Sequence, residues 1–176
     1  MQIKVDYEKA SARRYPEQVV IALARDAQGR IDPVAIGWTM TASREPPMIA
    51  VAVARTRYIL EAARSSRAFV VALPSTAMAM ETRFFGTRSG RDMDKLTECP
   101  IRTQPAHEVQ GVIARDALAN FECVLESEIA SGDHVILLGR VVAAHVNEDE
   151  SLARLFNLGP GYRLGSVKPE PVDAPT

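Results

Sequence analysis

Cysteine and histidine are scarce in this chain of 176 residues. The two cysteines, Cys99 and Cys123, lie far apart and form no Cys-x-x-Cys pair, which argues against a disulfide framework, a zinc knuckle and a thioredoxin-like centre. The three histidines, His107, His134 and His145, include no pair at the i, i+4 spacing of a helical metal site. We therefore expect no structural metal.

The chain also lacks an excess of one charge and any long apolar run. Its net charge is −1 with both signs scattered, which gives no reason to expect nucleic acid or an anionic membrane as a partner. No segment approaches the roughly 20 apolar residues of a membrane span, and residues 1–7 carry charges where a secretory signal needs apolar residues. We expect a cytoplasmic protein with one domain over residues 1–167 and a flexible tail over residues 168–176, which is rich in proline and acids.

The stretch from Phe85 to Lys95 is the most informative one in the sequence. It holds two glycines, two hydroxyl residues, two arginines and a lysine. Backbone N–H groups freed by glycine, hydroxyl donors and cationic side chains are what a phosphate group needs. Arg91 follows Gly90 where a Walker A loop has lysine, so we do not expect a nucleotide triphosphate. Taken alone, the stretch also fits an ordinary solvated turn.

Hydrophobic periodicity predicts mainly β-strands. The first half of the chain gives strands at Val19–Ala24, Ile31–Ser43, Met48–Ala54 and Phe69–Leu73, with a turn at Asp26–Gly29. Alanines fill one face of the Met48–Ala54 strand, which would let a helix, a second subunit or a flat ligand approach closely. Close packing inside the domain is an equally good interpretation.

Two later strands are predicted around a turn at Ser131–Asp133. In the first, Ala119 to Ile129, apolar residues including Cys123 share one face, and Asn120 and Glu122 lie on the other. The second, Val135–Val146, is apolar at nearly every position, as in a strand covered on both faces.

Short helices separate these strands. Thr56 is expected to cap a helix over Tyr58–Ser66, and residues 148–150 to cap one over Ser151–Phe156. Ser75 is expected to begin a helix that runs through about Phe84 and is ended by Gly86. The Gly159–Gly165 segment has the wrong spacing for a dinucleotide fingerprint and is interpreted as a loop. Many strands with few short helices predict a closed or nearly closed β-barrel rather than a doubly wound sheet.

A series of motifs in one order resembles the flavin reductase-like, FMN-binding split-barrel family, with the flavoredoxin and ferric-reductase branch nearest. These motifs are Tyr15-Pro16, Val19-Val20, Asp26–Arg30, Gly37–Met40, Ser43, Pro46-Pro47, Thr56–Tyr58, Gly86–Arg91, Asp94-Lys95, Gly132–His134 and Gly139–Val142. The resemblance implies a six-stranded Greek-key split barrel, a homodimer, and one FMN per subunit near the dimer interface.

The resemblance also implies a set of cofactor-binding residues. Those along the isoalloxazine would be Trp38, Thr39, Met40, Thr41 and Ser43. Those on the ribityl and phosphate side would be Thr56, Arg57, Tyr58, Ser89, Gly90, Arg91 and Lys95. A phosphate close to a dianion suits hydroxyls and one or two cations.

His134 is the candidate nicotinamide contact, because the family's flavin reductases carry a histidine at this turn. The alternative is a histidine that only satisfies backbone groups at the turn.

Three positions depart from the family's pattern. Ile59 replaces a hydroxyl residue, Phe85 a cysteine, and Asp32 an asparagine. Loss of a phosphate donor at Ile59 would cost about 1.5–3 kcal/mol of FMN binding. A carboxylate at Asp32 would lower the flavin's reduction potential if it lay nearby.

The implied activity is that of an oxidoreductase, a flavin reductase-like protein that passes electrons from NADH or NADPH through FMN to an acceptor. Flavin carries out the hydride chemistry, so no catalytic nucleophile or general base is required. Two alternatives stay open: a flavin-binding electron carrier reduced by a partner protein, and a split-barrel binder of another small anion. A redox protein or a monooxygenase is a possible partner.

Overall fold

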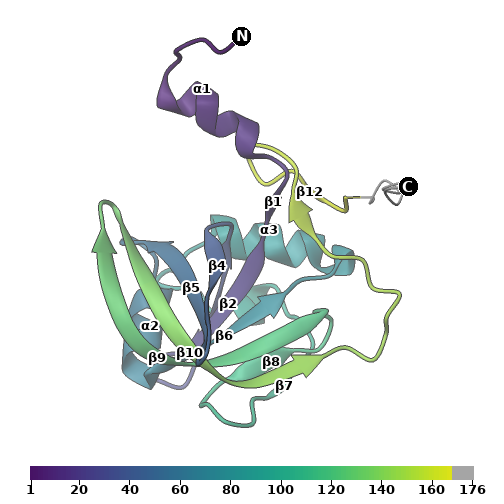
Figure 1. Cartoon of the computed structure of the whole chain (residues 1–176). Coiled ribbons are helices and arrows are strands. Elements are labelled where there is room, and N and C mark those ends of the chain that lie inside the picture. Colours follow the sequence, from purple (N-terminus) through teal and green to yellow (C-terminus); the bar gives the residue numbers. More distant parts are fainter. Residues whose placement is uncertain (168–176) are drawn as a thin grey trace.

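The computed structural model describes residues 1–167, and the predicted tail over residues 168–176 lies outside them. Its centre is a seven-stranded antiparallel sheet in the order β3-β2-β6-β9-β10-β5-β4 (Figure 1). The strands are β2 (Val20–Arg25), β3 (Ile31–Ile36), β4 (Thr39–Arg44), β5 (Pro47–Ala54), β6 (Ala68–Leu73), β9 (Ala119–Ser131) and β10 (His134–Val146). The predicted split β-barrel with short helices at its periphery is confirmed, with one strand more in its sheet than the six expected.

The first hairpin forms where the sequence predicts it. β2 pairs with β3 from Val20 opposite Ile36 to Arg25 opposite Ile31. The Asp26 carboxylate accepts hydrogen bonds from the backbone N–H groups of Gln28 and Arg30, both at 2.9 Å. The predicted single strand Ile31–Ser43 is wrong. β3 and its pairing with β2 end at Ile36, the chain turns at residues 37 and 38, and it continues as β4, which pairs with β5.

Two helices differ from the prediction at their ends. α2 (Ile59–Ser66) begins after Tyr58, and no side chain caps its N-terminus. The predicted cap by Thr56 is therefore wrong. The predicted end of α3 (Ala79–Thr87) at Gly86 is also wrong, since the helix runs on to Thr87 after the 3-10 turn η2 (Thr76–Met78). Gly86 is needed for packing, because a Cβ atom there would lie 2.5 Å from Cζ of Tyr162.

The long hairpin of β9 and β10 follows the prediction in part. Its turn lies between Ser131 and His134, and Cys123 is completely buried, as expected. The predicted polar face of β9 is also covered, because Glu122 and Asn120 are buried beneath β8 (Val112–Ala114) and the loop before it. β10 is not covered on both faces within one chain, since alternate residues stay half-buried and Val146 is 81% exposed.

The predicted helix over Ser151–Phe156 is absent from the described chain. Residues 156 and 157 instead form β11 (Phe156–Asn157), which joins β1 (Glu17–Gln18) to β12 (Leu164–Gly165) in a small sheet. The segment is drawn out because Leu155 N donates to Pro74 O at 3.0 Å and Ser75 bridges to Arg154.

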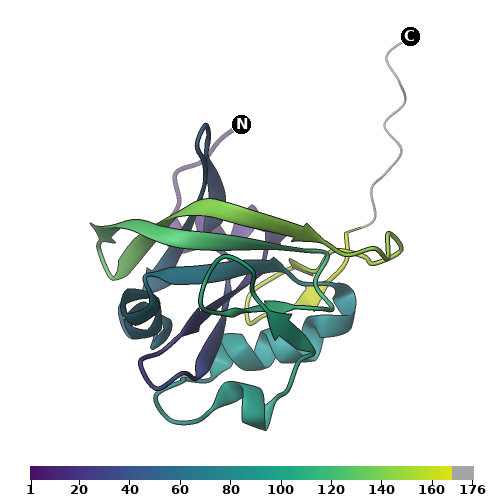
Figure 2. The same cartoon turned by 90° about the horizontal axis from the view of Figure 1, so that it is seen from below.

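The remaining elements lie at the margins. They are α1 (Tyr7–Ser11), η1 (Ala12–Arg14), α4 (Lys95–Glu98) and β7 (Thr103–Pro105). Figure 2 shows the green β9–β10 hairpin along one side of the molecule and the teal helix α3 on the opposite side. None of the described helices is long and apolar enough to cross a membrane.

Candidate functional site

A cleft of about 310 Å³ opens where β3 passes into β4, beside the end of β5 and the start of β10. Small residues line part of it, namely Ala35, Gly37, Ala52 and Ala54. Two segments far apart in the sequence complete its walls: Arg14–Glu17 before β2, and Gly161-Tyr162 near the C-terminal end of the described chain. The small side chains predicted on one face of the Met48–Ala54 strand therefore lie partly along a cleft.

Trp38 and His134 lie together at this cleft. Their ring centroids are 4.6 Å apart and the planes are tilted by 33°. The strand register explains the proximity, because His134 pairs with Ala54 on β5 and the backbone of Ala52 donates to Trp38 O at 2.8 Å. The Nδ1 atom of His134 lies 2.7 Å from Asp133 Oδ1, and this contact lowers the pKa of Asp133.

Arg57 contributes positive charge to the cleft. Its Nη2 donates to Gly86 O at 2.7 Å, and it forms no ion pair within residues 1–167. Tyr162 packs against Gly86 with a left-handed backbone (φ 56°), and burial raises the pKa of its hydroxyl. A guanidinium with free N–H groups beside this loop is suited to bind a phosphate or another anion.

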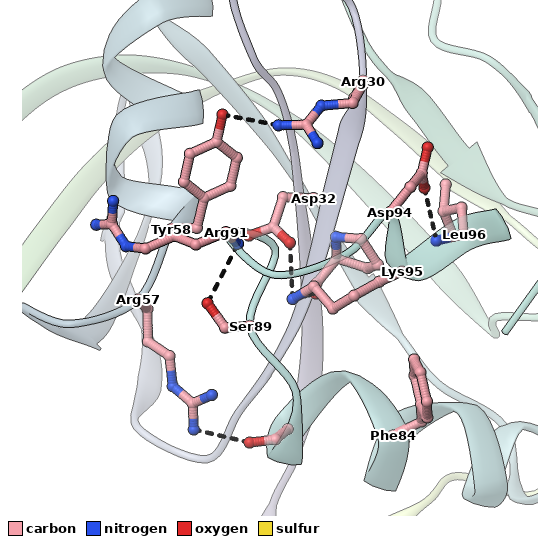
Figure 3. A network of polar contacts seen from close by, with 12 residues as sticks. Arg30, Asp32, Arg57, Tyr58, Phe84, Ser89, Arg91, Asp94, Lys95 and Leu96 are labelled. Carbon is pink, nitrogen blue, oxygen red and sulfur yellow. Dashed lines mark hydrogen bonds and ion pairs between the residues drawn. The ribbon is translucent and has the colours of Figure 1, made fainter. Parts of the chain in front are cut away.

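Tyr58 belongs to a separate polar network (Figure 3). Its hydroxyl donates to Asp26 Oδ2 at 3.0 Å and accepts from Arg30 Nη2 at 3.2 Å. Burial works against ionisation of Asp26, but hydrogen bonds from Arg30 and Tyr58 outweigh it and lower the pKa of this carboxyl. Tyr58 is thereby fixed in place by protein groups.

The loop with Ser89, Gly90 and Arg91 borders this network. Ser89 Oγ accepts from Arg91 N at 3.2 Å (Figure 3). The Arg91 guanidinium pairs with Glu61 at 2.5 Å. Arg91 and Glu61 are exposed, so this ion pair can open at little cost. Lys95 differs from the phosphate-facing lysine that the resemblance implied, because its side chain is 2% exposed and its amine pairs with Asp32 at 2.7 Å.

Four of the predicted cofactor-binding residues line a different groove. Thr39, Met40, Thr41 and Ser43 lie on the edge strand β4 and border an apolar groove of about 450 Å³. Its other walls come mainly from β5, β6, β9 and β10, with single residues from β1 and β2 and the side chain of Arg154. Thr56 is exposed in the turn before α2. The predicted residues are therefore divided among the cleft, this groove and the polar network.

The three departures from the family's pattern now have places. Ile59 and Phe85 are fully buried in two apolar clusters, so neither side chain faces a ligand. The side chain at position 59 points into the core, so a hydroxyl residue there would not face a phosphate, and the expected loss of a phosphate donor at Ile59 does not follow. Asp32 is buried beside Lys95, which compensates its charge.

Several cleft residues were absent from the predicted site. Arg14, Glu17 and Tyr162 line the cleft, and Glu17 accepts a hydrogen bond from Asn157 Nδ2 at 3.1 Å. The Gly-Pro-Gly-Tyr sequence before Arg163 was the available signal, since a turn with an aromatic residue can close over a site. It was interpreted only as a loop.

The fold agrees with comparisons to known proteins. A family model described as the flavin reductase like domain matches residues 12–163, so the chain belongs to this family. A probable flavin reductase of Rhizobium meliloti is 31% identical over 140 residues, which are 71% of this chain and 38% of that protein.

Solved structures show the same fold. A flavoredoxin from Methanosarcina acetivorans has a TM-score of 0.84 at 22% identity and matches 99% of this chain and 95% of its own. An FMN-binding protein from Thermus thermophilus gives 0.85 at 22% identity and matches 99% and 100%. The chain spans only 61–66% of the length of the first curated relatives that it matches, which are archaeal proteins.

Proposed function

We propose that the chain binds FMN in the cleft and transfers electrons from NADH or NADPH through it to an acceptor. The observation that carries the proposal is the cleft itself, where the adjacent Trp38 and His134 rings, small wall residues and Arg57, which has no ion-pair partner in the described chain, border one space. A volume of about 310 Å³ lies within the range of small-molecule sites, which is about 300–1,000 Å³.

The residues present fit a flavin. Small side chains at Gly37, Ala52 and Ala54 let a planar ring approach the strands closely. Arg57 would hold the phosphate through its free N–H groups, and Arg91 could join it after leaving Glu61. When bound, FMN supplies hydride acceptance and the onward transfer of one or two electrons.

Trp38 and His134 would orient the nicotinamide. Trp38 is 48% exposed and lies tilted against His134, so part of the pair is open to a second planar group. Asp133 holds the His134 ring in one orientation through Nδ1. No proton transfer from protein is needed for hydride transfer, which is consistent with a cleft that holds no nucleophile paired with a base.

We also propose that two copies associate through the apolar groove beside β4. Met40 is 61% exposed there and lies with Met48, Phe121 and Val141 on surface that one chain leaves uncovered. A dimer formed through β4 would bury this surface next to Trp38, and so could help close the cleft. The size of the protein by sedimentation over a dilution series tests this proposal.

Anaerobic spectroscopy tests the proposed function. FMN is titrated into the protein and its absorbance and fluorescence are followed, with riboflavin and FAD in parallel, and then NADH or NADPH is added. Binding of FMN in preference to riboflavin, followed by bleaching of the flavin absorbance, supports the proposal. Absence of FMN binding at 100 µM overturns it, because a site worth only about 5–6 kcal/mol would already begin to fill. Binding without bleaching would favour an electron carrier.

A further inference from the structure

Lys95 is the first residue of α4, yet its side chain lies inside the protein. Its Nζ is 2.7 Å from Asp32 Oδ1 and also donates to Pro33 O, so both partners are on β3. Asp94 caps the helix by accepting from Leu96 N at 3.1 Å. Lys95 thus ties the start of α4, and with it the end of the loop over residues 88–94, to β3.

Gly90, in the middle of this loop, lies against the same Asp32 carboxylate, which Figure 3 shows beside Lys95. A Cβ atom at Gly90 would come closer than 3.0 Å to Asp32 Oδ1 and to Tyr58 Cδ1. Tyr58 is itself fixed by its hydrogen bond to Asp26. The path of the loop backbone at Gly90 is therefore set by where Asp32 lies, and Asp32 is held by Lys95.

The two charges also depend on each other. Burial raises the pKa of Asp32 and lowers the pKa of Lys95, and the ion pair opposes both shifts. Loss of one partner leaves an uncompensated charge in the interior, whereas loss of both leaves none. The side chains consequently act as a unit, and a change at one is partly corrected by a change at the other.

We propose that Lys95 acts through Asp32 as a positioning residue, which holds the Ser89–Asp94 loop for the flavin phosphate without touching the ligand. This inference rests on the proposed function for the identity of the ligand. It assigns phosphate contact on this loop to the half-buried Ser89 and the exposed Arg91. It also explains why a lysine in a loop of phosphate-binding composition is buried.

A double-mutant cycle tests the inference. FMN and riboflavin affinities are measured for the parent, Lys95→Met, Asp32→Asn and the double variant. We expect Lys95→Met to weaken FMN about tenfold or more, and the double variant to return to within about threefold of the parent, because its interior carries no unpaired charge. Riboflavin should change less throughout. If Lys95 contacts the phosphate directly, the double variant stays as weak for FMN as Lys95→Met, and the inference is overturned.

A second measurement does not depend on flavin. Hydrogen exchange of the amides of residues 90–92 is followed in the flavin-free protein. Lys95→Met should speed exchange there, and the added Asp32→Asn change should slow it again. Unchanged exchange in Lys95→Met would contradict the inference. If the parent binds no FMN, the proposed function fails, while this measurement still decides whether the pair positions the loop. If Lys95→Met does not fold, the double variant decides, because a direct contact requires its FMN affinity to fall far more than its riboflavin affinity.

Gly90→Ala supplies an independent perturbation of the same contact. Its Cβ would press on Asp32 and Tyr58, so we expect faster exchange in the loop and weaker FMN binding. Gly111→Ala is the matched control, because a Cβ there meets no atom closer than 3.8 Å. Equal effects of the two substitutions would show that close packing at Gly90 does not set the loop, and would count against the inference.

Discussion

Replacement of Arg57 by methionine is the most direct perturbation of the proposed phosphate end of the cleft. The guanidinium uses one N–H group on Gly86 O at 2.7 Å and forms no ion pair in the described chain, so its other donors are available to a ligand. One hydrogen bond to a charged group contributes about 1.5–3 kcal/mol. We therefore expect Arg57→Met to weaken FMN by roughly 10- to 150-fold, with riboflavin almost unchanged because it has no phosphate.

Isothermal titration of FMN and riboflavin provides the measurement, with Arg83→Met as the control. Arg83 is exposed on α3, and its side chain forms no hydrogen bond or ion pair within residues 1–167, so its replacement changes the net charge equally but should leave both affinities within about twofold. Raised salt should weaken FMN binding by the parent more than by Arg57→Met. Equal losses for FMN and riboflavin, or an unchanged FMN affinity, would refute the assignment of Arg57 to the phosphate.

Three further changes give separate expectations. Glu61→Gln releases Arg91 from its exposed ion pair and should strengthen FMN about two- to fivefold in the same titration, whereas weaker binding would show that the pair supports the site. Burial opposes ionisation of Glu122, but hydrogen bonds from the backbone N–H groups of residues 107–109 and from His145 outweigh it and lower the pKa of this carboxyl. The stability that the ionised Glu122 contributes is therefore complete above its unfolded-state pKa and is lost as the pH falls through its folded-state pKa. Melting temperatures of Glu122→Gln and the parent should accordingly converge towards low pH. Gly86→Ala should destabilise by about 1–3 kcal/mol in urea unfolding, because its Cβ would meet the Tyr162 ring.

The strands could be predicted because their alternation is decided by local burial. β2, β5, β6 and the turn between β9 and β10 lie where the sequence predicts them. Helix ends were less predictable. Glycine is typical of the residue that ends a helix, but at position 86 a glycine is required because Tyr162, far away in the sequence, packs against it. The helix predicted over residues 151–156 does not form, again because of a contact with a segment distant in the sequence: the pairing of β11 with β1 outweighs the capping pattern.

Several site residues make contacts in the fold with residues that lie far from them in the sequence. Trp38 and His134 meet because β5 pairs on one side with β4 and on the other with β10, which the strand order decides. Glu122 resembled a solvent-facing strand residue, yet it is buried because it accepts three backbone hydrogen bonds from one loop. Alternation along β9 alone could not reveal that cover.

The cationic side chains of the predicted site show most clearly that residue type alone does not decide which group a side chain contacts. Arg57 and Lys95 both belong to motifs of phosphate-binding composition, but the fold gives one of them a backbone carbonyl and the other a buried carboxylate. The difference arises at Asp32, whose charge needs compensation inside the protein, whereas an uncharged residue there would leave Lys95 without this partner. We therefore expect the residue at position 32 on β3 to decide whether Lys95, at the start of α4, is held by the protein or is available to a ligand. The FMN affinity of Asp32→Asn, within the cycle above, tests this expectation.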